Sequence, residues 1–267
     1  MTPPVALTIA GSDSGGGAGV QADLKAFAAN GVFGTCAVTA LTAQNTVGVL
    51  GVQVTPPDFV DAQISAVLAD LPVAAVKTGM LATEAIIEIV ARRAAAGDLP
   101  NLVVDPVMVA SSGDRLLDEG AELAYLERLF PYAVIVTPNL REASLLVGRE
   151  LSDLADMAEA ARELATTGAC AVLVKGGHLA GDAVDVFFDG EQVHELASRR
   201  VVTANVHGTG CTTAAAIAAR LARGDTLGAA VRAAKIYITS AIAGAATWQL
   251  GSGHGPVDHF GWGTDAK

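Results

Sequence analysis

Short apolar segments alternate along this chain with longer segments that carry the start and stop signals of helices. The apolar segments are rich in β-branched residues or bounded by glycine, which is typical of buried strands. We predict strands at residues 5–10, 35–43, 73–77, 101–105, 133–136 and 170–174, and a hairpin from 183–188 and 192–196. We predict helices at about 20–30, 56–71, 83–96, 116–130, 152–166 (capped by Ser152), 212–222 and 226–247.

This alternation predicts an α/β fold in which helices cover both faces of a mainly parallel sheet. In such sheets ligands bind beyond the carboxyl ends of the strands. Polar residues of interest lie in the turns after Ala10, Ala43, Lys77, Asp105, Val136 and Val174. The pattern therefore places a functional site at one edge of the sheet.

Composition supports one large domain. The chain has 267 residues, of which 51% are hydrophobic and 17% charged, so it can bury a substantial core. No linker or repeat divides it, and we expect a single domain over residues 1–267. Residues 26–57 are uncharged, but glycines and amides interrupt them, so buried strands and loops are expected there and no membrane span.

Charge and cysteine content limit the classes of partner and the cellular compartment that can be expected. The net charge is −11 without a basic cluster, which argues against nucleic acid as a partner. Cys36, Cys170 and Cys211 are widely spaced and form no metal-ligand pattern. The N-terminus lacks the cationic start of a secretory signal. A protein of the reducing cytoplasm is expected.

An alanine-rich helix is preceded by residues 205–211, Asn-Val-His-Gly-Thr-Gly-Cys. Glycines let the backbone approach an anion closely, and the first N–H groups of a helix point at it. Gly208, Thr209 and Gly210 therefore form a candidate cradle for a phosphoryl group, with the Cys211 thiol beside it. The alternative is a glycine-rich helix start with a buried cysteine behind it.

Two common nucleotide-binding motifs are absent. The first glycine-rich loop, residues 15–19, reads Gly-Gly-Gly-Ala-Gly, not GxGxxG, and no acidic residue lies between Leu24 and Pro57 to hold a ribose. None of the five lysines follows a glycine, which excludes GxxxxGK[ST]. A nucleotide must bind here through another arrangement.

Seven motifs in order indicate that arrangement. They are AGSDSGGGAGVQADLK (10–25), TALTAQNT (39–46), KTGML (77–81), DPVM (105–108), TPNLREA (137–143), KGGH (175–178) and HGTGC (207–211). Over nearly the whole chain they resemble the ribokinase-like superfamily, and within it the hydroxymethylpyrimidine/phosphomethylpyrimidine kinases of thiamine biosynthesis. The resemblance implies a ribokinase-like three-layer α/β sandwich.

The resemblance also implies catalytic roles. Cys211 stands where the superfamily's sugar kinases carry an aspartate base, so it would help to deprotonate the substrate hydroxymethyl group. A free thiol has a pKa of ~8.5, and we expect the helix N-terminus to lower it. Gly208, Thr209 and Gly210 would form the anion hole. The second phosphorylation has an anionic acceptor, so Cys211 should matter mainly for the first.

ATP and Mg²⁺ are the implied cofactors. Asn139 and Glu142 form the N-x-x-E pattern that organises Mg²⁺ in the superfamily, and Asp105 could supply a second carboxylate. Lys175, with Asn139 and Thr209, would bind the ATP phosphates. Two alternatives stay open: Glu142 as an ordinary carboxylate in the first turn of a helix, and Lys175 as a solvated residue.

The implied pyrimidine pocket has six members: Gly11, Ala18, Asp23, Gln44, Met80 and Val107. The Gln44 amide matches the donor and acceptor groups of an aminopyrimidine edge. Asp23 could accept from the hydroxyl or amino group, or could be an acid at a helix start. Met80 and Val107 would enclose the ring, although a core role is the alternative for each.

The implied reaction is phosphorylation of 4-amino-5-hydroxymethyl-2-methylpyrimidine to its monophosphate and then its diphosphate, by a homodimer. The alternatives are a pyridoxal or pyridoxine kinase, since related members with the Gly-Thr-Gly-Cys loop act on that ring, and a non-catalytic pyrimidine-binding protein. A sugar kinase is disfavoured because the loop ends in Cys211. His207 and His178 are expected to act only through other residues, and lids are expected near 111–114 and 197–204.

Overall fold

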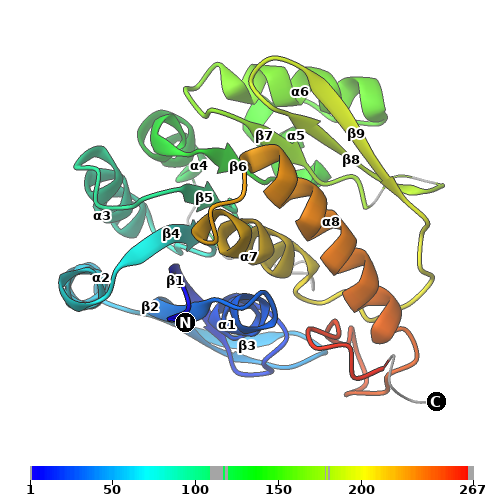
Figure 1. The fold of residues 1–267 in the computed structure, drawn as a ribbon, viewed down its shortest axis with the longest axis horizontal. Coiled ribbons are helices and arrows are strands. Elements are labelled where there is room, and N and C mark those ends of the chain that lie inside the picture. Colours follow the sequence, from blue (N-terminus) through cyan, green and yellow to red (C-terminus); the bar gives the residue numbers. More distant parts are fainter. Residues whose placement is uncertain (1, 109–116, 118–119, 178, 180, 264–267) are drawn as a thin grey trace.

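The computed structural model describes residues 2–108, 117, 120–177, 179 and 181–263. The strands of this part are β1 (Val5–Asp13), β2 (Phe33–Gln44), β3 (Val49–Val54), β4 (Val73–Thr78), β5 (Leu102–Val104), β6 (Ile135–Val136), β7 (Val172–Val174), β8 (Ala183–Phe188) and β9 (Val193–Ser198). They form one sheet in the order β3-β2-β1-β4-β5-β6-β7-β8-β9 (Figure 1). The run from β2 to β7 is parallel, and β3, β8 and β9 pair antiparallel at the edges.

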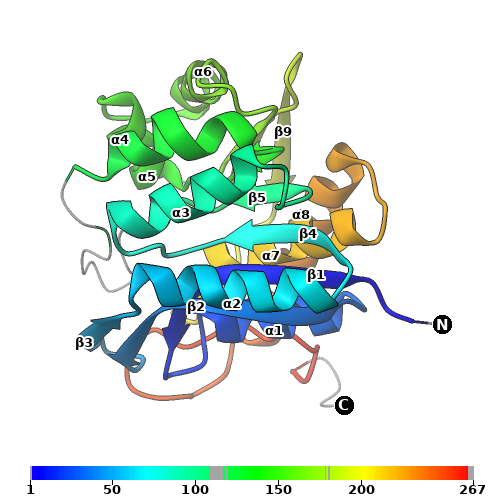
Figure 2. The same ribbon diagram turned by 90° about the vertical axis from the view of Figure 1, so that its left-hand side faces the viewer.

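Helices cover both faces of the sheet, as predicted. They are α1 (Gly19–Ala29), α2 (Pro57–Asp70), α3 (Glu84–Ala95), α4 (Glu122–Ala124), α5 (Leu140–Val147), α6 (Leu154–Ala165), α7 (Thr209–Ala222) and α8 (Leu227–Gly244). In Figure 2, α2 and α3 lie in front of the sheet and α7 and α8 behind it. No helix among the described residues combines the length and hydrophobicity that crossing a membrane requires.

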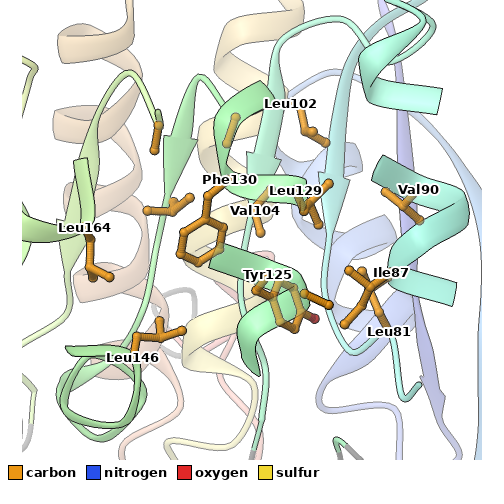
Figure 3. Packing of buried hydrophobic residues seen from close by; sticks show 14 of the residues in the cluster. Leu81, Ile87, Val90, Leu102, Val104, Tyr125, Leu129, Phe130, Leu146 and Leu164 are labelled. Carbon is orange, nitrogen blue, oxygen red and sulfur yellow. The ribbon is translucent and has the colours of Figure 1, made fainter. Parts of the chain in front are cut away.

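Two separate cores result because successive strand residues point to opposite faces. In β1, Ala6 packs with α1, α7 and α8, whereas Leu7 packs with α2, α3, α5 and α6. The first core consists largely of alanine, which lets α7 lie close to the sheet. The second is filled by larger side chains, among them Tyr125, Phe130 and Leu164 (Figure 3). The fold thus buries α7 and fixes where its N-terminus lies.

Four elements differ from the prediction. No separate strand was predicted at β3 within the uncharged residues 26–57, because the side chains of β3 are mostly exposed and polar and apolar residues do not alternate there. Helix α5 was not among the predicted helices. The predicted helix at 116–130 is, in its described part, the short α4 followed by a π turn (Tyr125–Leu129) and a 3₁₀ turn (Phe130–Tyr132). Asp153, not Ser152, caps α6, because its carboxylate accepts the N–H of Asp156 at 2.9 Å.

Candidate active site

Four neighbouring parallel strands bring polar side chains to one edge of the sheet. Lys77 lies near the end of β4, Asp105 follows β5, Asn139 follows β6 and Lys175 follows β7. Parallel neighbours end at the same edge, so residues about 100 positions apart in the sequence become neighbours. The structure thus gathers these polar side chains at the edge where the strand pattern predicts a site.

Lys175 joins this edge to the start of α7. Its Nζ lies 2.7 Å from Oδ1 of Asp105, and the same oxygen accepts the hydroxyl of Thr137 at 3.0 Å. A Cβ placed on Gly210 would lie 3.1 Å from the Lys175 Nζ. Lys175 is therefore a largely covered, paired cation beside the glycine-rich loop, not a solvated residue.

Glu142 and Asn139 hold the start of α5. The Asn139 side chain accepts the Glu142 N–H at 3.0 Å, and the Glu142 carboxylate accepts the Asn139 N–H at 2.8 Å, which makes a capping box. Glu142 is 4% exposed. Burial raises its pKa to about 7, and Asp105 adds to this while Lys175 opposes it. Glu142 is therefore a carboxylate in the first turn of a helix, as the alternative expected, and its role toward Mg²⁺ stays a prediction.

The carboxylates fit a magnesium ion that also binds phosphate. Oδ2 of Asp105 is buried and has no hydrogen-bond partner among the described residues. These residues contain no group of three or more His, Cys, Asp or Glu side chains that could hold a metal. Mg²⁺ is usually held by one or two carboxylates, with water and substrate phosphates completing its shell. Asp105 and Glu142 match that donor set.

The loop before α7 is fastened to the first glycine-rich loop. Gly208 has φ +81°, and a Cβ there would overlap the carbonyl oxygen of Gly17. Next to it, Nε2 of His207 lies 2.8 Å from Oδ2 of Asp13. The Asp13 carboxylate also accepts the backbone N–H groups of residues 15, 17 and 18. Burial acts to raise the pKa of Asp13, but the bonds from His207 and the backbone hold it below its usual value.

Asp13 is thus a positioning residue that sequence reasoning missed. Its signal is its place at the end of the first strand, directly before a glycine-rich turn, where a carboxylate can bind several N–H groups at once. His207 contacts Asp13 directly, and its supporting role stays a prediction. His178 and the lid expected at 111–114 lie outside the described residues.

Cys211 lies in the first turn of α7, and the N–H of Gly19 at the start of α1 interacts with its sulfur. The expectation that a helix N-terminus lowers the thiol pKa is wrong. Burial raises the pKa of Cys211 to about 11; Lys77 and Gly19 lower it, while Asp23 and Asp105 raise it further. At neutral pH the side chain is a thiol.

A small apolar cluster forms mainly from the residues that follow β4 and β5. Met80 packs there with Ala40 and Ala82, and Val107 joins them. A Cβ on Gly11 would lie 3.0 Å from the sulfur of Met80. The structure therefore brings together Gly11, Met80 and Val107, three of the residues expected to line the pyrimidine pocket.

Gln44 and Ala18 adjoin the first glycine-rich loop. Gln44 ends β2, and its backbone exchanges hydrogen bonds of 2.7 and 2.8 Å with the Ser14 hydroxyl. Its side-chain oxygen accepts the Thr42 hydroxyl at 3.0 Å. Ala18 immediately precedes α1. Both residues are partly exposed, so both remain accessible to a ligand.

Asp23 has a different place from the one expected. Its carboxylate is fully buried, pairs with Nζ of Lys77 at 2.8 and 3.0 Å, and accepts the Thr8 hydroxyl at 2.6 Å. A carboxylate that is covered in this way does not contact a ligand directly. No functional role was predicted for Lys77 from the sequence, although a lysine inside an apolar strand indicates a buried charge that needs a partner.

Comparisons with known proteins assign the chain to a family. The family model described as phosphomethylpyrimidine kinase matches residues 13–258. The chain belongs to the phosphomethylpyrimidine kinase family. The predicted family, the ribokinase-like α/β fold and the kinase class are thereby confirmed.

Individual relatives agree with this assignment. The chain is 53% identical over 261 residues to the hydroxymethylpyrimidine/phosphomethylpyrimidine kinase of Rhizobium meliloti, covering 96% of this chain and 97% of the relative. It is 54% identical to the thiamine biosynthesis bifunctional protein ThiED of Geobacter sulfurreducens, covering 95% of this chain but only 52% of that protein. The chain thus spans about half the length of this bifunctional relative.

A solved structure shares the fold over almost the entire chain. It is an ADP complex of Bacillus subtilis pyridoxal kinase, with a TM-score of 0.89 and 41% identity, covering 97% of this chain and 98% of that one. Its similarity keeps the vitamin B6 alternative relevant to the choice of substrate.

Proposed function

We propose that this chain uses ATP to phosphorylate 4-amino-5-hydroxymethyl-2-methylpyrimidine and then phosphorylates the resulting monophosphate to the diphosphate. One observation carries the proposal: the glycine-rich start of α7 lies beside the Asp105–Lys175 pair and is fastened to the loop that adjoins Gln44. A phosphate-binding half and an acceptor-binding half thus meet at Cys211.

The phosphate half would bind and orient ATP. The first N–H groups of α7 have no acceptor within the helix, so those of Gly210 and Cys211 suit the transferred phosphoryl group. Lys175 would neutralise phosphate charge, and Asn139 and Thr209 would contact the nucleotide. Asp105 and Glu142 would hold Mg²⁺, which when bound withdraws charge from the phosphates.

The acceptor half would present the hydroxymethyl group to the phosphate. Gln44 would read the edge of the ring, and Met80 and Val107 would enclose its faces beside Gly11 and Ala18. The thiolate form of Cys211 would accept the hydroxyl proton as the oxygen attacks phosphorus. The monophosphate is already anionic, so the second transfer does not need this base.

Residues 197–204, where a lid is expected, are hydrogen-bonded through Arg200 to the loop that follows β7. Arg200 donates to the carbonyl oxygens of Gly181 at 2.6 Å and Gly177 at 2.7 Å, and also to that of Leu179. Gly177 follows Lys175 by two residues. We propose that this segment orders the loop after β7 around the phosphates.

A substrate panel tests the proposed function. The chain is incubated with ATP and Mg²⁺ and either hydroxymethylpyrimidine, pyridoxine or pyridoxal, and products are identified by mass. Monophosphate followed by diphosphate from the pyrimidine is the expected result. Products from the B6 compounds alone would assign the chain to the second candidate, which the fold shared with pyridoxal kinase favours. No product from any acceptor would favour a non-catalytic binding protein.

We further propose a homodimer located in the cytoplasm. The edge strand β3 exposes apolar side chains, including Leu50 at 82%, which supports association. Cys36, Cys170 and Cys211 are all free thiols, as is usual in a reducing compartment.

A further inference from the structure

A fully buried ion pair joins β4 to α1. Lys77 and Asp23 are both fully covered, and the ammonium lies 2.8 and 3.0 Å from the two carboxylate oxygens. Replacing such a pair by well-packed apolar residues is often neutral or stabilising, because removing two charges from water is unfavourable. Stability alone therefore does not account for this pair.

The pair is arranged around Cys211. Asp23 lies one helical turn after Gly19, whose N–H interacts with the Cys211 sulfur, so both are on the same side of α1. Helix α7, which carries Cys211, packs against both α1 and β4, the strand of Lys77. Lys77 thus lies where these three elements meet.

Local structure keeps the lysine in this place. Thr8 donates its hydroxyl to Asp23 at 2.6 Å and helps to fix the carboxylate that holds the ammonium. A Cβ on Gly79 would lie 2.7 Å from the Lys77 Nζ, so glycine leaves the room that the ammonium occupies. Strand, helix and glycine together hold one cation at a set position.

We propose that Lys77 is a positioning residue for phosphoryl transfer, whose ammonium, anchored by Asp23 and Thr8, stabilises the negative charge that forms on the Cys211 sulfur. Asp23 then acts through Lys77 and not by contact with the substrate. The inference rests on the proposed function for its use in catalysis, but the electrostatic link between Lys77 and Cys211 does not.

Four charged groups from the surrounding elements interact electrostatically with the sulfur: Lys77 from β4, Asp23 from α1, Asp105 after β5 and Lys175 after β7. Lys77 favours the thiolate, whereas Asp23 and Asp105 disfavour it. Removal of the two partners is therefore expected to change the thiolate fraction of Cys211 in opposite directions. Removing the positive partner must lower the thiolate fraction, and removing the negative partner must raise it.

The test measures the alkylation of Cys211 by iodoacetamide at a fixed, mildly alkaline pH, with the modified cysteine identified by mass because Cys36 and Cys170 also react. Lys77→Met should slow alkylation of Cys211 about tenfold or more, since a change of one pKa unit alters the thiolate fraction tenfold. Asp23→Asn should accelerate it. A merely structural pair would shift both variants in the same direction, which would overturn the proposal.

Two further variants keep the test decisive. Should either single variant fail to fold, Asp23→Asn combined with Lys77→Gln retains hydrogen-bonding capacity without charge, and slower alkylation is again expected; an unchanged rate would overturn the proposal. Lys235→Met removes a comparable ion pair, in which Lys235 lies 2.8 Å from Asp185, and should leave Cys211 unaffected. A fall in its alkylation rate would show that loss of any such pair suffices.

Activity gives a separate readout. In Lys77→Met, kcat for the hydroxymethyl acceptor should fall more than kcat for the monophosphate acceptor, which needs no base. An unchanged alkylation rate of Cys211 in Lys77→Met would refute the electrostatic link between Lys77 and Cys211. Lack of kinase activity in the unmodified chain, with the alkylation effect intact, would instead refute the proposed function.

Discussion

Glu142 and Lys77 are buried ionisable side chains and Cys211 is a partly buried one, and loss of hydration disfavours the charged form of each. For Glu142 and Cys211 it prevails, with pKa values of about 7 and about 11. Lys77 stays charged because the Asp23 carboxylate is in direct contact with it, and its pKa is raised. At neutral pH the Cys211 thiol is thus neutral and the Glu142 carboxyl group is only partly ionised, while Lys77 and Lys175 keep their charge. Such a balance favours an anionic ligand in a chain whose net charge is −11.

The raised pKa of Glu142 predicts a pH-dependent stability. Below pH 4.5 the folded and unfolded states both hold the proton, and between 4.5 and about 7 only the folded state holds it. The free energy of unfolding should therefore decrease as pH rises through this window, by on the order of 1–3 kcal/mol. Glu142→Gln cannot titrate but keeps the capping-box acceptor, so its stability relative to the unmodified chain should increase over the same window.

Urea denaturation at both ends of this pH range measures the effect. Glu159→Gln is the control, because Glu159 is an exposed carboxylate on α6. The free energy of unfolding of this variant should differ from that of the unmodified chain by the same amount at both pH values. A Glu142→Gln variant whose relative stability does not change with pH would contradict the assignment of a buried, protonated carboxyl group.

Cys211→Ala should separate the two phosphorylations. General-base assistance contributes typically about 10²–10⁴-fold, so kcat for the hydroxymethyl acceptor should fall within that range. The monophosphate acceptor needs no deprotonation, and its kcat should fall much less. Steady-state kinetics with each acceptor measure the ratio, and Cys170→Ala at an exposed position is the control. Equal losses for both acceptors would mean that Cys211 only shapes the site.

At the scale of elements, the start of α7 depends on contacts with distant loops. The helix begins at Gly208, whose left-handed φ of +81° turns the chain against Gly17, and the Asp13–His207 bond fixes this contact. The sequence predicted the helix and its glycine-rich start. Its contact with the first loop was not predicted, because the residues involved are separated by 194 positions.

The central strands could be predicted because buried parallel strands are continuous apolar runs, and their common edge then located Asp105, Asn139 and Lys175. Partnerships that depend on packing could not. The Lys77–Asp23 pair joins residues 54 positions apart on a strand and a helix, and nothing local in the sequence reveals it. The thiol pKa of Cys211 was mispredicted for the same reason, because burial outweighs the effect of the helix terminus.

Gly208→Ala should strongly destabilise the loop. The substitution imposes a left-handed φ on alanine, which costs about 1 kcal/mol, and adds an overlap with the Gly17 carbonyl oxygen. Gly224→Ala is a matched control, since Gly224 also has a left-handed φ (+89°) but nothing within 4 Å of its Cβ position. Thermal denaturation should show a larger loss for Gly208→Ala, together with loss of kinase activity. Equal losses of thermal stability in the two variants would exclude the contact between the loops as the cause of the destabilisation.

At the scale of the whole molecule, the two edges of the sheet differ in character. The outer strand β9 carries His194 and Glu195, and polar groups of this kind discourage pairing with another chain. The opposite edge, β3, exposes Leu50 at 82% and Val52 at 44%. Only the second edge lacks this protection, so it is the edge at which two copies are expected to associate.

Leu50→Lys should therefore convert a dimer into a monomer, because a charge on the β3 edge would have to be buried on association. The mass in solution, measured by light scattering during size-exclusion chromatography, should be twice that of the 26.9 kDa chain before the substitution and equal to it afterwards. Val202→Lys is the control, since Val202 is 93% exposed but lies outside any strand, and this variant should remain dimeric. A monomeric unmodified chain would refute the homodimer. A dimer that survives Leu50→Lys but not Val202→Lys would move the interface to the segment that follows β9.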